Sequence, residues 1–353
     1  MDDQTFGVAG KVEARRTVRM LVESLTRQRL TLNSGKTRFL TPPEQAEHFW
    51  LDANEMLDSA QVYADAKVRY PARVCLEYIW GVCEGKEKKG HWDKVYKRIL
   101  RVAALAHTDC VTLAACKTMI VEAPSLAERV FEYLLARNRY AEYLQLWQWL
   151  ARTKNNIYED VEMAWFEQVL LVSPPRAARE AFLSVASAVL RGRYRGSGKP
   201  GVMVPAALLV YWFWDGRQGR ILETLLSRDG LPPDARRTVA AILCARKSGN
   251  WKQWLLLAGR HASREVAGLI GFVTRITSGE PLELVQPLVF VKRPVVYDRF
   301  IYDARAWLRL ELLAMSPNKG IKVGIKQVLA KALKHPLTQV EEASAKRIAV
   351  KVK

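Results

Sequence analysis

The sequence predicts a mainly α-helical protein, in which an irregular, solenoid-like array of helices follows a small α/β segment. From residue 44 onward, apolar residues recur at the spacing of one helix face in almost every segment. The connections between these segments are short, as in stacked antiparallel helical hairpins. We find no fixed sequence period that would identify a particular repeat family.

The first forty residues differ from the rest. Residues 12–30 carry apolar side chains on one side and arginines on the other, which predicts an amphipathic helix. A turn at 33–35 precedes residues 37–40, whose polar and apolar side chains alternate as in a half-buried strand. The Pro42-Pro43 pair ends this α/β unit, because proline cannot continue a regular element.

The predicted helices after residue 43 follow from apolar periodicity and from prolines at first-turn positions. Their expected cores are 44–68, 71–83, 92–106, 110–121, 125–136, 139–152, 157–171, 175–191, 203–214, 217–227, 234–246, 250–259, 263–277, 282–291, 297–314, 322–333 and 338–351.

Charge and composition restrict the class of protein. The 353 residues include 55 Lys+Arg and 36 Asp+Glu, a net charge of +19 that predicts binding to polyanions. The five cysteines form no CxxC pair, and the histidines have no metal-ligand spacing. The longest apolar run, 204–214, is too short to cross a bilayer. We therefore expect a cytoplasmic protein without a membrane partner, a zinc site or a catalytic triad.

Asp2 and Asp3 form an adjacent carboxylate pair at the start of the sequence. A carboxylate pair at a frayed terminus repels itself and stabilises nothing. Nucleotidyl transfer, in contrast, uses aspartates that bridge two divalent metal ions. The order of aspartate pair, helix and strand is the one found in palm-type polymerases.

The stretch RQRLTLNSGKTRFLTPPEQAEHFW resembles the end of the palm in bacterial reverse transcriptases, where a Leu-x-Leu-Asn tract leads to a strand that contains Lys-Thr. The aspartate box of that family, Tyr-x-Asp-Asp, is matched by Met1-Asp2-Asp3, about thirty residues upstream. The resemblance covers about residues 1–60. It implies that Asp2 and Asp3 are catalytic metal ligands, and that Asn33 and Lys36 lie beside the primer or nucleotide.

The sequence also departs from that family. The box tyrosine, the earlier palm aspartate, the fingers and the nucleotide-selecting segment are absent from the sequence. We therefore expect a carboxyl-terminal portion of an RNA-directed DNA polymerase that is inactive alone and binds Mg²⁺ only within a complete polymerase. The long helical part resembles the carboxyl-terminal extension of defence-associated, abortive-infection reverse transcriptases. This resemblance implies a phage-defence role, with RNA or single-stranded DNA as partners and with further copies of the chain as potential partners in a homo-oligomer.

A phosphate-binding loop is the competing interpretation of LNSGKT. Its pattern needs glycine at position 30, where Leu30 stands, and a helix that continues beyond the lysine. A broader alternative to the polymerase is a non-catalytic, basic helical-repeat protein that binds nucleic acid or a protein partner.

Two basic segments are further candidates for contact with nucleic acid. The glycine-rich stretch 191–202 contains four cations and one aromatic ring that can stack on a base, namely Arg191, Arg193, Tyr194, Arg195 and Lys199. It is equally typical of a flexible linker. The tail from Met315 to Lys353 holds nine basic residues and two glutamates, and we expect Lys319, Lys322, Lys326 and Lys331 to share one helix face.

These observations divide the chain into five segments. They are the palm end (1–43), a connecting helix (44–69), a first helical block (70–190), the basic loop (191–202) and a second helical block with the basic tail (203–353).

Overall fold

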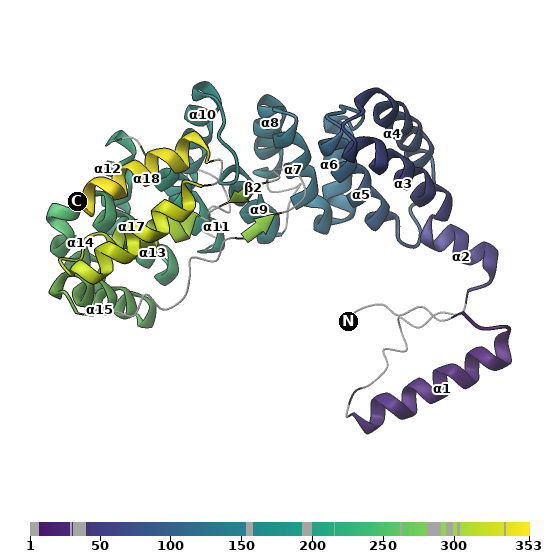
Figure 1. Ribbon diagram of the computed structural model, residues 1–353, viewed down its shortest axis with the longest axis horizontal. Helices are drawn as coiled ribbons and strands as arrows, with labels where there is room; N and C mark the ends of the chain where they lie inside the picture. The colour runs from purple at the N-terminus through teal and green to yellow at the C-terminus, as the bar shows by residue number, and fades with distance from the viewer. Residues whose placement is uncertain are drawn as a thin grey trace.

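The computed structural model describes residues 7–28, 30, 40–152, 158–192, 200–214, 216–261, 263–280, 291–293, 299–301, 304–334 and 337–353. Within these ranges the protein is mainly α-helical, as the sequence predicts. Figure 1 shows the helices side by side in an extended body, with α1 (Lys11–Arg27) set apart from it.

The helices of the body begin with α2 (Pro42–Phe49), α3 (Leu51–Asp65), α4 (Arg69–Glu84), α5 (Trp92–Leu105), α6 (Leu113–Glu122), α7 (Ala127–Ala136), α8 (Tyr140–Leu150), α9 (Glu159–Val169) and α10 (Arg176–Leu190). They continue with α11 (Pro200–Trp212), α12 (Gly216–Leu226), α13 (Pro233–Arg246), α14 (Trp251–Gly259), α15 (Arg264–Ser278), α16 (Ala304–Leu313), α17 (Lys319–Ala332) and α18 (Gln339–Lys351). Two short 3₁₀ helices, η1 (Pro124–Leu126) and η2 (Ser248–Asn250), precede α7 and α14.

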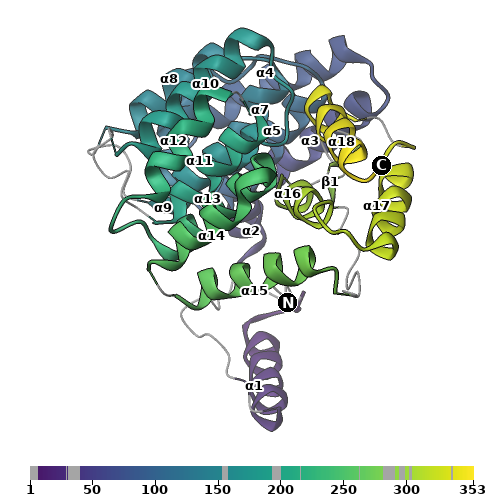
Figure 2. The ribbon, with the colours of Figure 1, turned by 90° about the vertical axis from the view of Figure 1, so that its left-hand side faces the viewer.

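The body contains two rows of helices. In the first row α3, α5, α7, α9, α11 and α13 each pack against the next member. In the second row α6, α8, α10, α12 and α14 do the same. Helices α16, α17 and α18 pack against one another, and α16 also contacts α11 and α13; Figure 2 views this end of the body. Each row buries its apolar faces between neighbours that are close in sequence.

Aromatic rings fill the middle of the body. The rings of Tyr143 and Trp165 stack at 4.9 Å, and Trp147 lies 4.7 Å from Trp165. Tyr143 donates its hydroxyl hydrogen to the Trp165 carbonyl at 2.5 Å, and Trp165 Nε1 donates to the Tyr143 carbonyl at 3.2 Å. Phe182 of α10 closes the cluster at 5.8 Å from Trp165. These contacts join α8, α9 and α10 through side chains that are almost fully buried.

A buried ionic network joins α11, α13, α16 and α18. The Glu311 carboxylate accepts a hydrogen bond from the Tyr211 hydroxyl at 3.0 Å and from Lys351 Nζ at 3.1 Å. Arg246 Nη1 lies 3.6 Å from the same carboxylate, and both side chains are at most 3% exposed. Burial beside Glu311 raises the pKa of Tyr211 well above its usual range, so Tyr211 stays a donor.

The single helix predicted over 44–68 is wrong, because the chain breaks at Trp50 between α2 and α3. Trp50 adopts a left-handed backbone conformation with φ at 52°. Its indole is buried, and its Nε1 donates to the Lys89 carbonyl at 2.8 Å. This long-range contact offsets the backbone strain of a non-glycine residue in that conformation.

The helix predicted over 297–314 also begins too early, since α16 starts at Ala304. Residues Val291–Arg293 (β1) and Arg299–Ile301 (β2) instead form an antiparallel pair, with Val291 opposite Ile301. The alternating and β-branched residues of VFVKRPVVYDRFI favour strands over helices. The basic loop predicted over 191–202 ends earlier, because Pro200 already occupies the first turn of α11.

The predicted α/β segment is described in part. Its helix is confirmed as α1, which ends at Arg27 rather than at residue 30. Val18, Leu21 and Leu25 are half-buried, whereas Val22 and Leu30 are exposed. Most of the predicted strand at 37–40 lies outside the described residues.

Candidate phosphate-binding pocket

Most of the site residues predicted from the sequence lie outside the described residues. They are Asp2, Asp3, Asn33, Lys36, Arg193, Tyr194, Arg195 and Lys199. Arg191 is described, and it directly follows the last residue of α10. This arginine lines a pocket that the sequence did not reveal.

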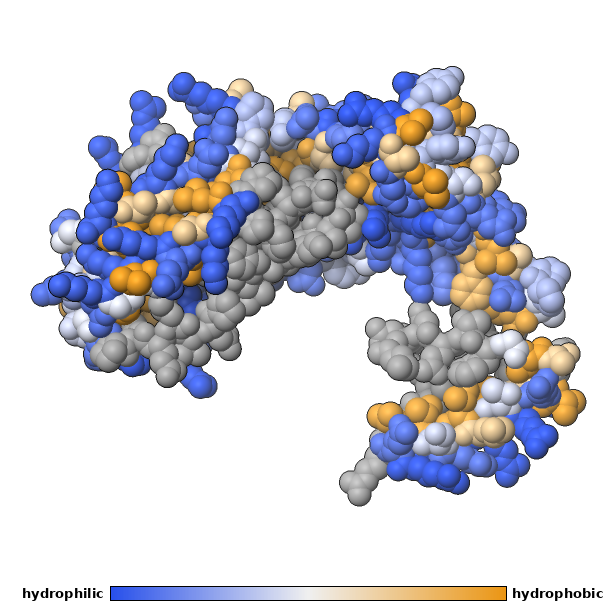
Figure 3. All heavy atoms as spheres, viewed as in Figure 1, coloured by the Kyte–Doolittle hydropathy of each residue, from blue (hydrophilic) through white to orange (hydrophobic). Residues whose placement is uncertain are grey.

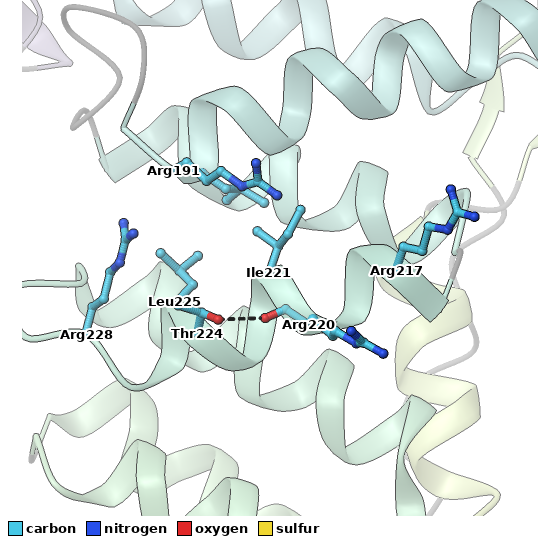
Figure 4. A pocket seen from close by; sticks show the side chains of 8 residues that line it. Arg191, Arg217, Arg220, Ile221, Thr224, Leu225 and Arg228 are labelled. Atoms are coloured by element: carbon cyan, nitrogen blue, oxygen red, sulfur yellow. Dashed lines mark hydrogen bonds between the residues drawn. The ribbon is translucent and has the colours of Figure 1, made fainter.

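The pocket has a volume of about 290 Å³ and lies between the carboxyl-terminal end of α10 and helix α12. Four arginines line it, namely Arg191, Arg217, Arg220 and Arg228. Figure 4 shows Arg191 just after α10, Arg217 and Arg220 on α12, and Arg228 just after the end of α12, with their guanidinium groups spread along the pocket. Four arginines along one pocket make the local potential positive.

Helical periodicity explains why α12 presents its arginines to one side. Arg217, Ile221 and Thr224 recur at intervals of three or four residues, so they share a face, and Arg228 follows just after the helix end. Leu222 and Leu226 project from the opposite face and are buried. Because the buried face packs against the body, it determines which side chains of α12 line the pocket.

A buried arginine holds the end of α12 in place. Arg236 of α13 is 2% exposed, and it donates to the Leu226 carbonyl at 3.2 Å and to the Arg228 carbonyl at 2.9 Å. Burial lowers the pKa of the Arg236 guanidinium from its ordinary value. These two bonds satisfy carbonyls at the helix end and fix the backbone at Arg228.

Nearby carboxylates are engaged elsewhere. Glu223 of α12 pairs with Lys247, and Asp229 Oδ1 lies 3.0 Å from His261 Nε2. Among the described residues, no ion pair joins Arg191, Arg220 or Arg228 to a carboxylate. These three side chains are exposed, so their donors are available to an anion from solution.

The floor of the pocket is apolar. Leu190 and Leu225 are buried, and Ile221 is half-buried between them and the arginine rim. Guanidinium groups bind phosphate oxygens through paired N–H donors and also stack on planar rings. An apolar floor under such a rim suits a nucleotide, whose phosphate would contact the rim while its base covers the floor.

A second pocket of about 400 Å³ has a different character. It lies between α13 and α15, and Glu265 contributes a carboxylate to its lining beside Arg264. Its other arginine, Arg237, forms an ion pair with Asp234 at 3.2 Å. The mixed charge makes this pocket a poorer phosphate site.

The lysines of the basic tail do not share one face. Ile321, Ile325 and Leu329 form the buried face of α17, so Lys319, Lys322 and Lys326 lie on one flank of the helix. Lys331 projects from the other flank. The single basic face predicted from the sequence is therefore wrong for Lys331 alone.

The sequence analysis missed Arg217, Arg220 and Arg228. The spacing of Arg217 and Arg220 within a predicted helix was a usable signal, because it places them on adjoining faces, whereas Arg228 lies just beyond that helix. Nothing in the sequence brought that helix to Arg191, which lies 26 positions before Arg217. In the described part of the chain, no group of three or more His, Cys, Asp or Glu residues is arranged to hold a metal ion.

Comparison with protein-family models, curated proteins and solved structures found no match to this chain. Among the described residues, none of the helices has the length and apolar character needed to cross a membrane.

Proposed function

We propose that this chain is the carboxyl-terminal portion of an RNA-directed DNA polymerase and that its helical body binds the phosphate backbone of RNA or single-stranded DNA. The arginine pocket between α10 and α12 is the observation that carries the binding proposal. The net charge of +19 supports it, since a basic protein attracts polyanions over long range. The polymerase assignment is supported by the residues of 1–60 that resemble a palm.

Arg191 links the pocket to the basic segment. It lines the pocket, and it also begins the stretch that carries Arg193, Tyr194, Arg195 and Lys199. One strand can therefore contact the rim of the pocket and this segment together. Binding of this kind reads the backbone rather than the base sequence.

Asp2 and Asp3 would hold Mg²⁺ in the complete polymerase, where the ion would stabilise charge on the transferred phosphate. The body would bind the product or template, and the phage-defence role remains part of this proposal. Without the missing palm and fingers, the chain should incorporate no nucleotides.

A salt series tests the binding proposal. Arg191, Arg220 and Arg228 are changed together to glutamine, and fluorescence anisotropy with a labelled oligonucleotide gives the affinity at several salt concentrations. Losing three phosphate contacts should reduce the slope of log affinity against log salt by about 2. Arg101, Arg152 and Arg176, which are exposed and lie outside the pocket, form the matched control triple. Equal slopes for the two triple variants would refute the proposal.

A second experiment tests the polymerase assignment. The chain is extended with the coding sequence that precedes it in the genome, and nucleotide incorporation is measured with Mg²⁺. Asp2→Asn and Asp3→Asn should each abolish incorporation while the melting temperature stays the same. Incorporation that survives both substitutions would contradict the assignment.

The alternative function is that of a non-catalytic, basic helical-repeat protein. The two rows of helices favour it, because each helix packs on the next member of its row and on sequence neighbours, as in repeat proteins. Under this alternative, binding to the oligonucleotide persists but the extended chain incorporates nothing.

A further inference from the structure

Phosphate binding alone does not explain the apolar floor of the arginine pocket. Phosphate oxygens are bound by charged donors, to which apolar side chains add nothing. Ile221 nevertheless lies at the centre of the pocket, half-buried beside the buried Leu190 and Leu225. Figure 3 shows hydrophilic side chains projecting from the edge of the body near α10 and α12. The floor is therefore a small apolar surface within charged surroundings.

Arg191 and Ile221 face each other across the pocket. Figure 4 shows the Arg191 guanidinium, which comes from the end of α10, over the Ile221 side chain, which comes from α12. A guanidinium is flat and stacks on the face of an aromatic ring. An isoleucine side chain can cover the other face of such a ring with apolar surface. The two side chains are therefore suited to hold a planar, aromatic group between them.

The other arginines lie on both sides of this centre. Figure 4 places Arg217 and Arg220 on one side of Ile221 and Arg228 on the other. Arg217 and Arg228 are eleven positions apart, which corresponds to about 16 Å along a helix axis. This span is longer than one phosphate group. It suits a chain of phosphates with an aromatic group between two of them.

The volume of the pocket limits what can enter it. Its 290 Å³ lie just below the range of about 300–1,000 Å³ that is typical of small-molecule sites. The pocket is therefore too small for a base pair, whose two bases would have to enter together. In a duplex, moreover, each base must first leave the stack before it can reach such a floor.

We propose that one unpaired base of a single strand enters the pocket and lies between the Arg191 guanidinium and Ile221, while the phosphates on either side of it contact Arg220 and Arg228. This inference rests on the proposed function, because the base belongs to the strand whose backbone the body binds. It adds that the pocket recognises an unpaired base and not only a polyanion.

The lining of the pocket favours no particular base. Thr224 is the one described lining side chain that is neither apolar nor charged, and its hydroxyl donates to the Arg220 carbonyl at 2.9 Å. Stacking tolerates every base, because each base has an aromatic face. We therefore expect binding that requires a base but does not depend on its identity.

A comparison of two labelled probes tests the proposal. Fluorescence anisotropy with the full chain gives the affinity for oligodeoxythymidine and for an abasic strand of the same length at one salt concentration. The strand with bases should bind at least about fivefold more tightly, because the abasic strand keeps the phosphates and loses the stacked ring. Equal affinities would overturn base insertion but leave the phosphate binding of the proposed function intact. Binding to neither strand would overturn both.

Two substitutions locate the preference in the pocket. Arg191→Lys keeps the positive charge and loses the flat guanidinium, and Ile221→Ser removes the apolar contact, so each should reduce the preference for the strand with bases at least twofold. Arg101→Lys and Ile270→Ser are the matched controls, because Arg101 is exposed, Ile270 is half-buried and both lie outside the pocket. Circular dichroism checks that each variant is folded. A preference that Arg191→Lys and Ile221→Ser leave at the native level would overturn the proposal.

Discussion

The Glu311 network offers a direct test of how the carboxyl-terminal helices are held. Glu311→Gln keeps the size of the side chain and removes its charge. In the protein, Glu311 is the carboxylate that faces Arg246 at 3.6 Å and Lys351 at 3.1 Å. The substitution would leave both cations without this counter-charge, and Arg246 is only 3% exposed.

Breaking a buried ion pair on one side typically costs about 3–5 kcal/mol, because a buried charge is left uncompensated. For a chain of this length that unfolds as one unit, the loss corresponds to about 4–7 °C in melting temperature. The Tyr211 hydroxyl can still donate to the amide oxygen of glutamine. The loss should therefore come mainly from the two cations.

Differential scanning calorimetry and urea unfolding measure the effect. Glu180→Gln is the matched control, because Glu180 pairs with Arg176 in an exposed position where such pairs contribute about 0.5 kcal/mol. If Glu311→Gln costs no more than Glu180→Gln, the buried network does not stabilise the end of the body. Combining Glu311→Gln with Lys351→Gln should recover part of the loss, since the second change removes one of the two cations.

Three further outcomes are expected. Gly279→Ala should lower the free energy of unfolding, measured in urea, by about 1 kcal/mol, because Gly279 has φ at 81° and an added Cβ would lie 3.3 Å from Pro317 Cγ. Gly249→Ala is the control and should have a smaller effect, because the space around Gly249 is open. Equal effects of the two substitutions would contradict this prediction. Burial lowers the pKa of His107, and the nearby Arg137 and Arg69 lower it further. The neutral imidazole therefore stabilises the folded protein above about pH 6.5, and this stabilisation is lost as the pH falls through the folded pKa. The urea midpoint should therefore drop between pH 7.5 and 5.5, and a His107→Asn variant with the same drop would refute the assignment. Burial raises the pKa of Cys83 to about 11 and that of Cys110, Cys116 and Cys244 to about 12. Ellman's reagent should therefore modify the half-buried Cys75 first. Fast reaction of all five thiols before the protein unfolds would exclude this packing.

Local information was enough to predict most of the helices. The apolar spacing of 92–106, 234–246 and 338–351 predicts helices that the structure places at 92–105, 233–246 and 339–351. Each of these segments carries its own apolar face and its own end signals, so neighbouring residues suffice to specify it. The polymerase resemblance remains a prediction, because its aspartates lie outside the described residues.

Tertiary structure alone decided the features that join distant parts of the chain. The break at Trp50 depends on the Lys89 carbonyl, 39 residues away. The Glu311 network depends on Tyr211, 100 residues away. The arginine pocket exists because α12 packs beside the end of α10, which brings Arg191 to the arginines of α12. Helical periodicity specifies which face of a helix is apolar, but only the stacking of the rows determines which charged side chains from different helices meet.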